Sequence, residues 1–150
     1  AGLLHDIGKV ALSTFVTADV KKIKDRAFGS ELPFQEAERR ILGIDHAELG
    51  ARLLEHWNLP DELVEVVRWH HEPQHDAPHR QVIDLVHVAD AVSLQAGIGA
   101  GTDGLHYQLV PEAIERLGLK RSLADGLLLE IESELEELAE LFNEVSKGDA

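Results

Sequence analysis

The adjacent residues His5 and Asp6, in the apolar stretch "GLLHDIGK", have side chains that could do chemistry. A carboxylate taken out of water is costly unless a cation accompanies it. Lys9 lies one helical turn after His5 and could supply that positive charge. A divalent metal ion could do so as well, provided that other segments contribute further ligands.

Three predicted helices offer such ligands on the same faces as their apolar residues. Spacings of three and four place His46 with Leu49, and His70 and His71 with the valines before them. A lone histidine on an apolar face is usually a core residue with satisfied hydrogen bonds. Taken as a set, however, they favour one metal site, because neutral imidazoles and carboxylates bind transition metals together. The predicted ligands are His5, Asp6, His46, His70, His71 and Asp90.

The segments that must position these residues read almost entirely as helices, with no alternating run typical of a strand. After a first helix that ends near "HDIGKVALS", we predict helices over 17–27, 34–42, 44–57, 60–71, 80–95, 111–118 and 122–147. Asp45 followed by Glu48 is a capping-box pattern for the helix over 44–57. The prediction is an all-α, compact helical bundle that forms one domain over 1–150.

The composition of the chain excludes some kinds of ligand and some kinds of metal site. The chain has 150 residues, a net charge of −14 and no cysteine. Duplex nucleic acid is therefore excluded as the main ligand, and any metal must be bound by His, Asp and Glu. We find no membrane-spanning stretch and expect a cytoplasmic protein. Because the chain has no methionine and begins within a helical pattern, we expect a longer parent chain with further helices and a regulatory domain upstream.

The arrangement of these motifs resembles a known family. The stretches "GIDHAELGARLLEHWNLPDELVEVVRWHHEP", "VIDLVHVADAVSLQAGIGAG" and "PEAIERLGL" are similar to HDOD domains, which are bacterial signalling modules related to the HD superfamily of metal-dependent phosphohydrolases. The order of "HDIGK", a lone His, "HH" and a final Asp resembles the ligand order of the HD-GYP branch. After "HHEP", however, no Gly-Tyr-Pro motif follows, which argues against cyclic di-GMP as the substrate.

The resemblance implies a role for each predicted ligand. Asp6 would bridge two metal ions, His5 and Asp90 would complete the shell of the first ion, and Lys9 would face the phosphate. The second ion would be held by His46, His70 and His71. The superfamily uses a further histidine upstream of the His-Asp pair, which this chain starts too late to include.

The resemblance also indicates the reaction and its cofactors. It implies hydrolysis of a phosphomonoester or phosphodiester, with a nucleotide as one candidate, and Asp6 and Lys9 as the catalytic residues. Iron, manganese, zinc, cobalt or nickel suit these ligands. The alternative is a non-catalytic HDOD output module that binds a partner protein or a nucleotide.

Other features have plainer interpretations. Trp57 and Trp69 are expected to be core anchors, and His87 is expected to lie at the surface or behind the ligands. The acidic helix over 122–147 has apolar residues at heptad spacing, so we expect it to pack along its own domain. A contact with a second copy in a homodimer is the alternative.

Overall fold

A computed structural model describes the helices around the predicted ligands. The described residues are 1–15, 22–23, 25, 32–73, 76–95, 97, 107–120, 126, 129–130 and 133–134. The chain divides into two compact units, Ala1–Gly118 and Leu119–Ala150. All of the predicted ligands belong to the first unit.

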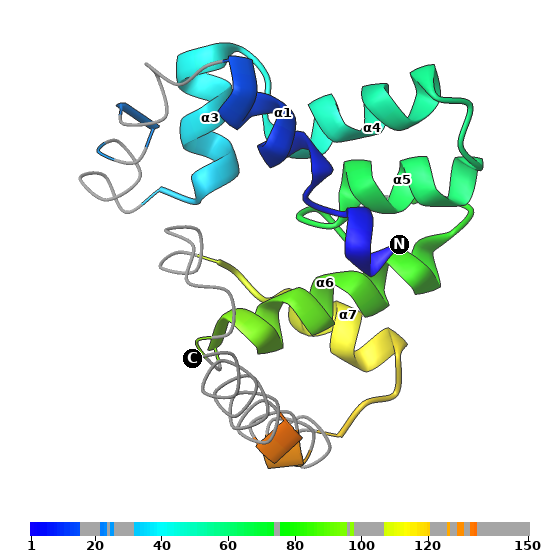
Figure 1. The fold of residues 1–150 in the computed structure, drawn as a ribbon. Coiled ribbons are helices and arrows are strands. Elements are labelled where there is room, and N and C mark those ends of the chain that lie inside the picture. The colour runs from blue at the N-terminus through cyan, green and yellow to red at the C-terminus, as the bar shows by residue number, and fades with distance from the viewer. Residues whose placement is uncertain are drawn as a thin grey trace, which may run out of the picture. The chain divides into compact units, whose positions relative to one another are not determined.

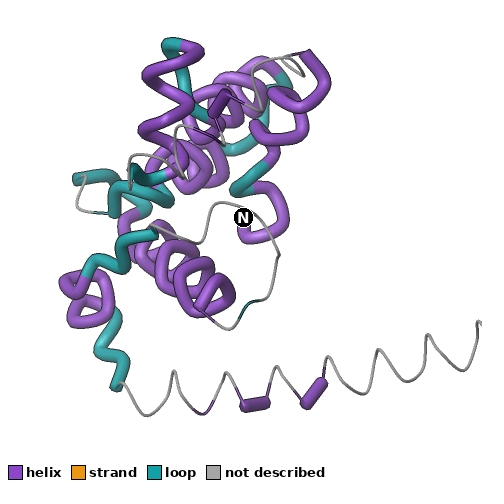
Figure 2. Tube along the Cα trace, turned by 90° about the vertical axis from the view of Figure 1, so that its left-hand side faces the viewer, coloured by secondary structure: helices purple, strands orange, loops and turns teal. Residues whose placement is uncertain are grey.

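The first unit is built from helices (Figure 1). They are η1 (Gly2–Leu4), α1 (Ile7–Phe15), α3 (Phe34–Leu42), α4 (His46–His56), α5 (Asp61–Trp69), α6 (Arg80–Gln95) and α7 (Pro111–Arg116). Figure 2 shows helices and loops, and no strand occurs among the described residues. The predicted all-α fold class is therefore confirmed. None of the helices in the described part of the chain is long and apolar enough to cross a membrane.

Two predicted helices fall mostly outside the described residues. Of the helix predicted over 17–27, the structure describes Lys22, Ile23 and Asp25, and all three are helical. Of the helix predicted over 122–147, it describes residues 126, 129–130 and 133–134, which are also helical. The heptad pattern of this last helix therefore stays a prediction.

The boundaries of α4 follow from local chemistry. Gly43 adopts a left-handed conformation (φ 76°), which ends α3 and turns the chain toward α4. The Asp45 side chain then accepts a hydrogen bond from the Glu48 amide at 2.8 Å, as the capping pattern predicts. This cap fixes the start of α4 at His46, the first of its residues expected to bind a metal.

α4 packs between α1 and α5, and the three helices lie side by side in Figure 1. Gly8 and Gly50 permit the close approach of α1 to α4. A Cβ atom on Gly8 would overlap the carbonyl oxygen of His46 and lie 2.9 Å from the Gly50 nitrogen. Behind this contact, an apolar cluster of Ala51, Leu54, Val64 and Val67 joins α4 to α5.

The two tryptophans differ in their surroundings. Trp69 is partly buried and packs against Val66, Ile83 and Val86, as expected for a core anchor. For Trp57 the prediction is wrong, because its side chain is 52% exposed. Trp57 is the C-cap residue of α4 and has left helical geometry, so the helical spacing no longer places it on the apolar face. Leu54, one turn earlier, is buried instead.

Candidate metal centre

The six predicted ligands come together at the N-terminal side of α1, the start of α4, the end of α5 and the middle of α6. Asp6 lies at the centre of this His/Asp cluster. Its Oδ1 is 3.3 Å from His46 Nε2 and 3.8 Å from His70 Nε2. Its Oδ2 is 3.4 Å from His5 Nε2, which in turn lies 3.5 Å from Asp90 Oδ1. The sixth member, His71, places its Nε2 2.8 Å from that of His46.

Within the cluster, four ligand atoms are close enough to share one ion. Asp6, His46, His70 and His71 each offer an atom, and all of these atoms lie within 4.8 Å of one another. The other oxygen of Asp6, Oδ2, lies near His5 Nε2, and Asp90 in turn lies near the same His5 nitrogen. The two oxygens of Asp6 therefore face two different groups of ligands.

Three of the histidines are oriented in the same way. In each, Nδ1 donates to an oxygen: His5 to the Gly2 carbonyl at 2.6 Å, His46 to Glu38 Oε2 at 2.5 Å and His70 to the Val67 carbonyl at 2.7 Å. Because these oxygens only accept hydrogen bonds, Nδ1 must carry the proton. The other ring nitrogen, Nε2, faces the Asp6 carboxylate in all three. This is how histidines that bind metals are held.

Glu38 is a functional candidate that the sequence analysis missed. It is 2% exposed, and its Oε2 accepts hydrogen bonds from both the ring and the backbone amide of His46. A signal was present in the sequence, since Phe34, Ala37 and Ile41 form an apolar stripe on α3 and Glu38 lies within it. An acidic residue on such a stripe needs a partner, and here the partner is His46.

Electrostatics divides the histidines into two kinds. Burial alone would lower the pKa of His5, but attraction to Asp6 and Asp90 outweighs it and raises the pKa to about 10. Burial lowers the pKa of His70 to about 3, and its histidine neighbours add to this effect. The pKa of His71 is also lowered, for the same reasons. His70 and His71 are therefore neutral, which is the form that binds metals.

Lys9 contributes positive charge at the edge of the cluster. Its ammonium group donates to Asp6 Oδ2 at 2.8 Å. Burial would raise the pKa of Asp6, but His5, Lys9 and His46 together hold it well below the usual range. Asp6 is therefore ionised. The sequence analysis expected Lys9 to face a phosphate, and in the structure its side chain contacts the carboxylate of the predicted bridging residue.

The cluster contains buried polar atoms that suit a cation. His5 Nε2, Asp6 Oδ1 and His70 Nε2 are buried and make no hydrogen bond. Such atoms are rare in folded proteins and call for an explanation. Imidazole nitrogens and carboxylate oxygens facing one another are the donor set of transition-metal sites. The residues present thus fit a divalent metal ion.

Two further residues lie directly behind the ligands. His87 is 0% exposed, and its Nδ1 donates to the His70 carbonyl at 2.7 Å. This agrees with the alternative expectation that His87 lies behind the ligands rather than at the surface. Tyr107, which the sequence analysis did not single out, places its ring 5.4 Å from those of His71 and His87. Burial and the nearby Asp90 raise the pKa of Tyr107.

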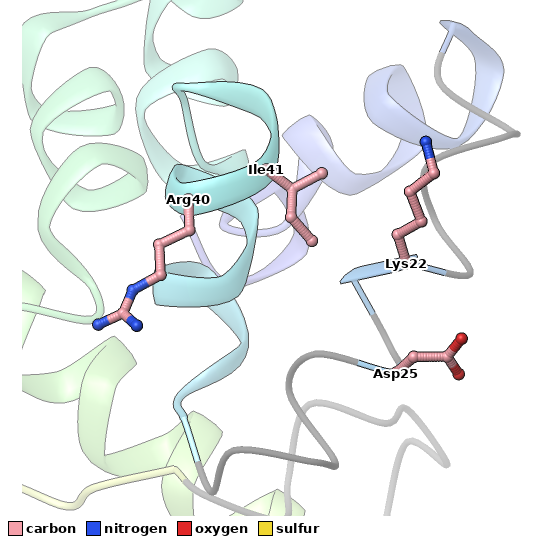
Figure 3. A pocket seen from close by; sticks show the side chains of 4 residues that line it. All are labelled: Lys22, Asp25, Arg40 and Ile41. Atoms are coloured by element: carbon pink, nitrogen blue, oxygen red, sulfur yellow. The ribbon is translucent and has the colours of Figure 1, made fainter.

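A pocket of about 480 Å³ lies elsewhere, beside α3. Lys22, Asp25, Arg40 and Ile41 line it (Figure 3). Their polar ends point in different directions in that view, and Arg40 is paired with Glu36 at 3.0 Å. The convergent chemistry of the described residues is at the His/Asp cluster and not at this pocket.

Known proteins resemble this chain in sequence and in fold. The model of the HDOD domain family matches residues 1–73. The match covers 73 of the 150 residues, just under half of the chain. The resemblance seen in the sequence is thereby confirmed. The HDOD match includes His5, Asp6, His46, His70 and His71, and it ends before Asp90.

Two known proteins are similar to this chain, one in sequence and one in fold. Over 74 residues the chain is 30% identical to an uncharacterized protein of Treponema pallidum (strain Nichols), covering 49% of this chain and 14% of that protein. The fold is similar to the crystal structure of a candidate signal transduction protein from Marinobacter aquaeolei VT8, with a TM-score of 0.77 and 22% identity. That similarity covers 93% of this chain and 30% of the other. The chain thus spans a minor part of both proteins.

Proposed function

We propose that this chain is a metal-dependent phosphohydrolase domain that works in bacterial signalling. The observation that carries the proposal is the common orientation of His5, His46 and His70, each with Nδ1 on an oxygen and Nε2 toward Asp6. Buried polar atoms without hydrogen bonds at the same place support it. The HDOD match and the signalling description of the Marinobacter protein support the cellular role.

The ligands fall into two sets that share Asp6. One ion would be held by Asp6 together with His46, His70 and His71, whose ligand atoms lie within 4.8 Å of one another. A second ion would be held by Asp6 with His5 and Asp90. Because nitrogen ligands dominate, iron, manganese, zinc, cobalt or nickel fit better than magnesium.

The proposed reaction is the hydrolysis of a phosphomonoester or phosphodiester, with a nucleotide among the candidate substrates. Bound divalent cations would supply a water molecule of lowered pKa and positive charge to balance the phosphate. The residues of the chain hold this centre in place: Glu38 orients His46, and the Val67 carbonyl orients His70. Lys9 keeps a positive charge beside Asp6, which matters because the chain as a whole carries a net charge of −14.

The second candidate is a non-catalytic HDOD module that binds a partner protein or a nucleotide. The feature that favours it is the sequence after "HHEP", where no Gly-Tyr-Pro motif follows. Such a module would keep the helical scaffold and could keep the metal ions. The two candidates differ in turnover, so they are separated by an activity assay and not by the fold.

Metal analysis of purified protein tests the centre itself. We expect wild-type protein to carry metal, and a His70→Ala, His71→Ala double variant to lose it. His56→Ala is the matched control, because His56 is an exposed histidine of α4 outside the cluster. If the wild type and the double variant carry the same substoichiometric amount of metal, the proposed centre does not exist.

A panel of phosphomonoesters and phosphodiesters, assayed with added manganese or iron, tests turnover. We expect hydrolysis of at least one compound by the wild type, and none by the double variant. If the metal-loaded wild type hydrolyses no compound, the catalytic part of the proposal is wrong and the binding module is favoured.

A further inference from the structure

His70 and His71 lie at the start of the connection between α5 and α6. At this point the connection is hydrogen-bonded to a buried histidine of α6, His87. The carbonyl oxygen of His70 accepts a hydrogen bond from His87 Nδ1 at 2.7 Å. The other ring nitrogen, Nε2, accepts from the amide of Val110 at 3.0 Å. Val110 is the N-cap residue of α7. The main chain at His70 is therefore linked through His87 to the start of α7.

A few residues further along the same connection, the main chain is hydrogen-bonded to the end of α7. Arg116 Nη2 donates to the Pro73 carbonyl at 3.0 Å. The same guanidinium group binds the buried carboxylate of Asp84 in α6 through two bonds of 2.7 and 2.6 Å. This two-bond arrangement fixes the direction of the guanidinium group. The main chain at Pro73 is therefore held by the last turn of α7.

The chemical form of His87 is set by its partners. Nε2 accepts a hydrogen bond from the Val110 amide, so it carries a lone pair, and Nδ1 carries the only ring proton. Burial lowers the pKa of His87, which keeps the ring in this neutral form. The Tyr107 ring stacks on it at 5.4 Å with an interplanar angle of 30°. His87 thus joins two backbone groups from different elements in one defined geometry.

We propose that α7 is the positioning element of the His70–His71 pair, acting through His87 on one side and Arg116 on the other. Figure 1 shows α7 lying along α6, on which His87 and Asp84 are placed one turn apart. Neither His87 nor Arg116 is a ligand or a catalytic residue; both are positioning residues. A displacement of α7 would then change the affinity of the metal centre. This inference rests on the proposed metal site.

The test compares three variants of the chain: His87→Leu, Arg116→Met and the control Arg68→Met. Arg68 is matched to Arg116, because the two side chains are 24% and 29% exposed and each binds a carboxylate on another helix. Arg68 holds Glu55 at 2.7 Å and contacts neither side of the histidine pair in any bond described above. Cobalt(II) is the probe, with binding followed by calorimetry and by the visible absorption spectrum.

We expect His87→Leu and Arg116→Met to bind cobalt about 10–100-fold more weakly and with an altered spectrum, as is typical when groups behind the ligands are removed. Arg68→Met should lose stability while keeping the affinity and spectrum of the wild type. His87→Gln should restore part of the affinity, because an amide can also donate to one backbone group and accept from another. If the wild type binds cobalt, equal cobalt affinity in all three variants would overturn the proposal.

A second measurement needs no metal and separates failure of this inference from failure of the metal site. Amide hydrogen exchange of a peptide spanning residues 70–73 is followed in the metal-free proteins. Faster exchange in His87→Leu and Arg116→Met than in Arg68→Met supports positioning by α7, even if the wild type binds no cobalt. Equal exchange in the three variants counts against it. If Arg116→Met does not fold, Arg116→Lys replaces it, since lysine keeps the charge but cannot make both bonds.

Discussion

Replacing Gly8 by alanine tests the packing that brings the cluster together. A Cβ atom at this position would overlap the His46 carbonyl oxygen, and it would lie 2.8 Å from the His46 carbonyl carbon and 2.9 Å from the Gly50 nitrogen. All three are backbone atoms, so no side chain can rotate away. Since carbon atoms in contact prefer about 3.5–4.0 Å, relieving the contact with the His46 carbonyl carbon requires α1 and α4 to separate by roughly 0.7 Å or more, and the closer carbonyl oxygen requires a larger shift.

The size of the effect follows from this displacement. Forcing extra atoms into a packed core costs about 1–3 kcal/mol, and more where the neighbours are rigid. We therefore expect Gly8→Ala to lower the free energy of unfolding by about 3 kcal/mol or more. At about 2–4 °C for each kcal/mol in a chain of this size, the unfolding temperature should fall by about 6–12 °C. The separation also moves His46 away from Asp6, now 3.3 Å apart, so metal affinity should fall as well.

Thermal unfolding of the metal-free proteins measures the first effect, with two alanine variants for comparison. At Gly2 no atom lies within 4 Å of the added Cβ, so Gly2→Ala should be nearly neutral. At Gly50 the nearest atom is Val67 Cγ1 at 2.9 Å, a side-chain atom that can shift, so Gly50→Ala should be intermediate. The reasoning is refuted if Gly8→Ala unfolds at the temperature of Gly2→Ala and binds metal as the wild type does.

Three other predictions address the cluster and the core. Glu38→Gln should weaken metal binding about 10–100-fold while the fold is kept, because Glu38 orients the His46 ring. Calorimetry with cobalt measures this affinity. Glu36→Gln, on the same helix, is the control and should have no effect. His5 has a pKa of about 10, so it is protonated in the metal-free protein at pH 7. Metal binding to His5 should therefore release about one proton, which makes the measured binding enthalpy depend on the buffer. Equal enthalpies in all buffers would contradict this prediction. Trp57→Ser should change stability by less than about 0.5 kcal/mol, whereas Leu54→Ala should cost about 2–5 kcal/mol in chemical denaturation.

The residues of the His/Asp cluster stand out in the sequence because their chemical types are conspicuous where they occur. His46 and His70 share faces with apolar residues, and helical spacing is enough to place them inward. The adjacency of His5 and Asp6 can be read directly from the sequence. Helical periodicity and the cap at Asp45 likewise fixed the described helices to within a few residues.

The sequence did not reveal which groups outside the His/Asp cluster hold its histidines in place by hydrogen bonds. The partners of His87 are the His70 carbonyl and the Val110 amide, and backbone groups leave no mark on a sequence. Glu38 did leave a mark, as an acid on an apolar stripe, but its partner lies eight residues away in another helix. The error at Trp57 has a similar origin, because periodicity does not reveal where a helix stops.

The charged groups of the His/Asp cluster compensate one another in the metal-free chain. Asp6 and Asp90 bring two negative charges into a partly buried place, and Lys9 and protonated His5 bring two positive ones. The charges of the cluster thus balance without a metal ion, and we expect the metal-free chain to fold, unlike small zinc domains whose ligands cannot be compensated otherwise. A divalent cation bound at the cluster would take the place of the positive charge of the His5 proton.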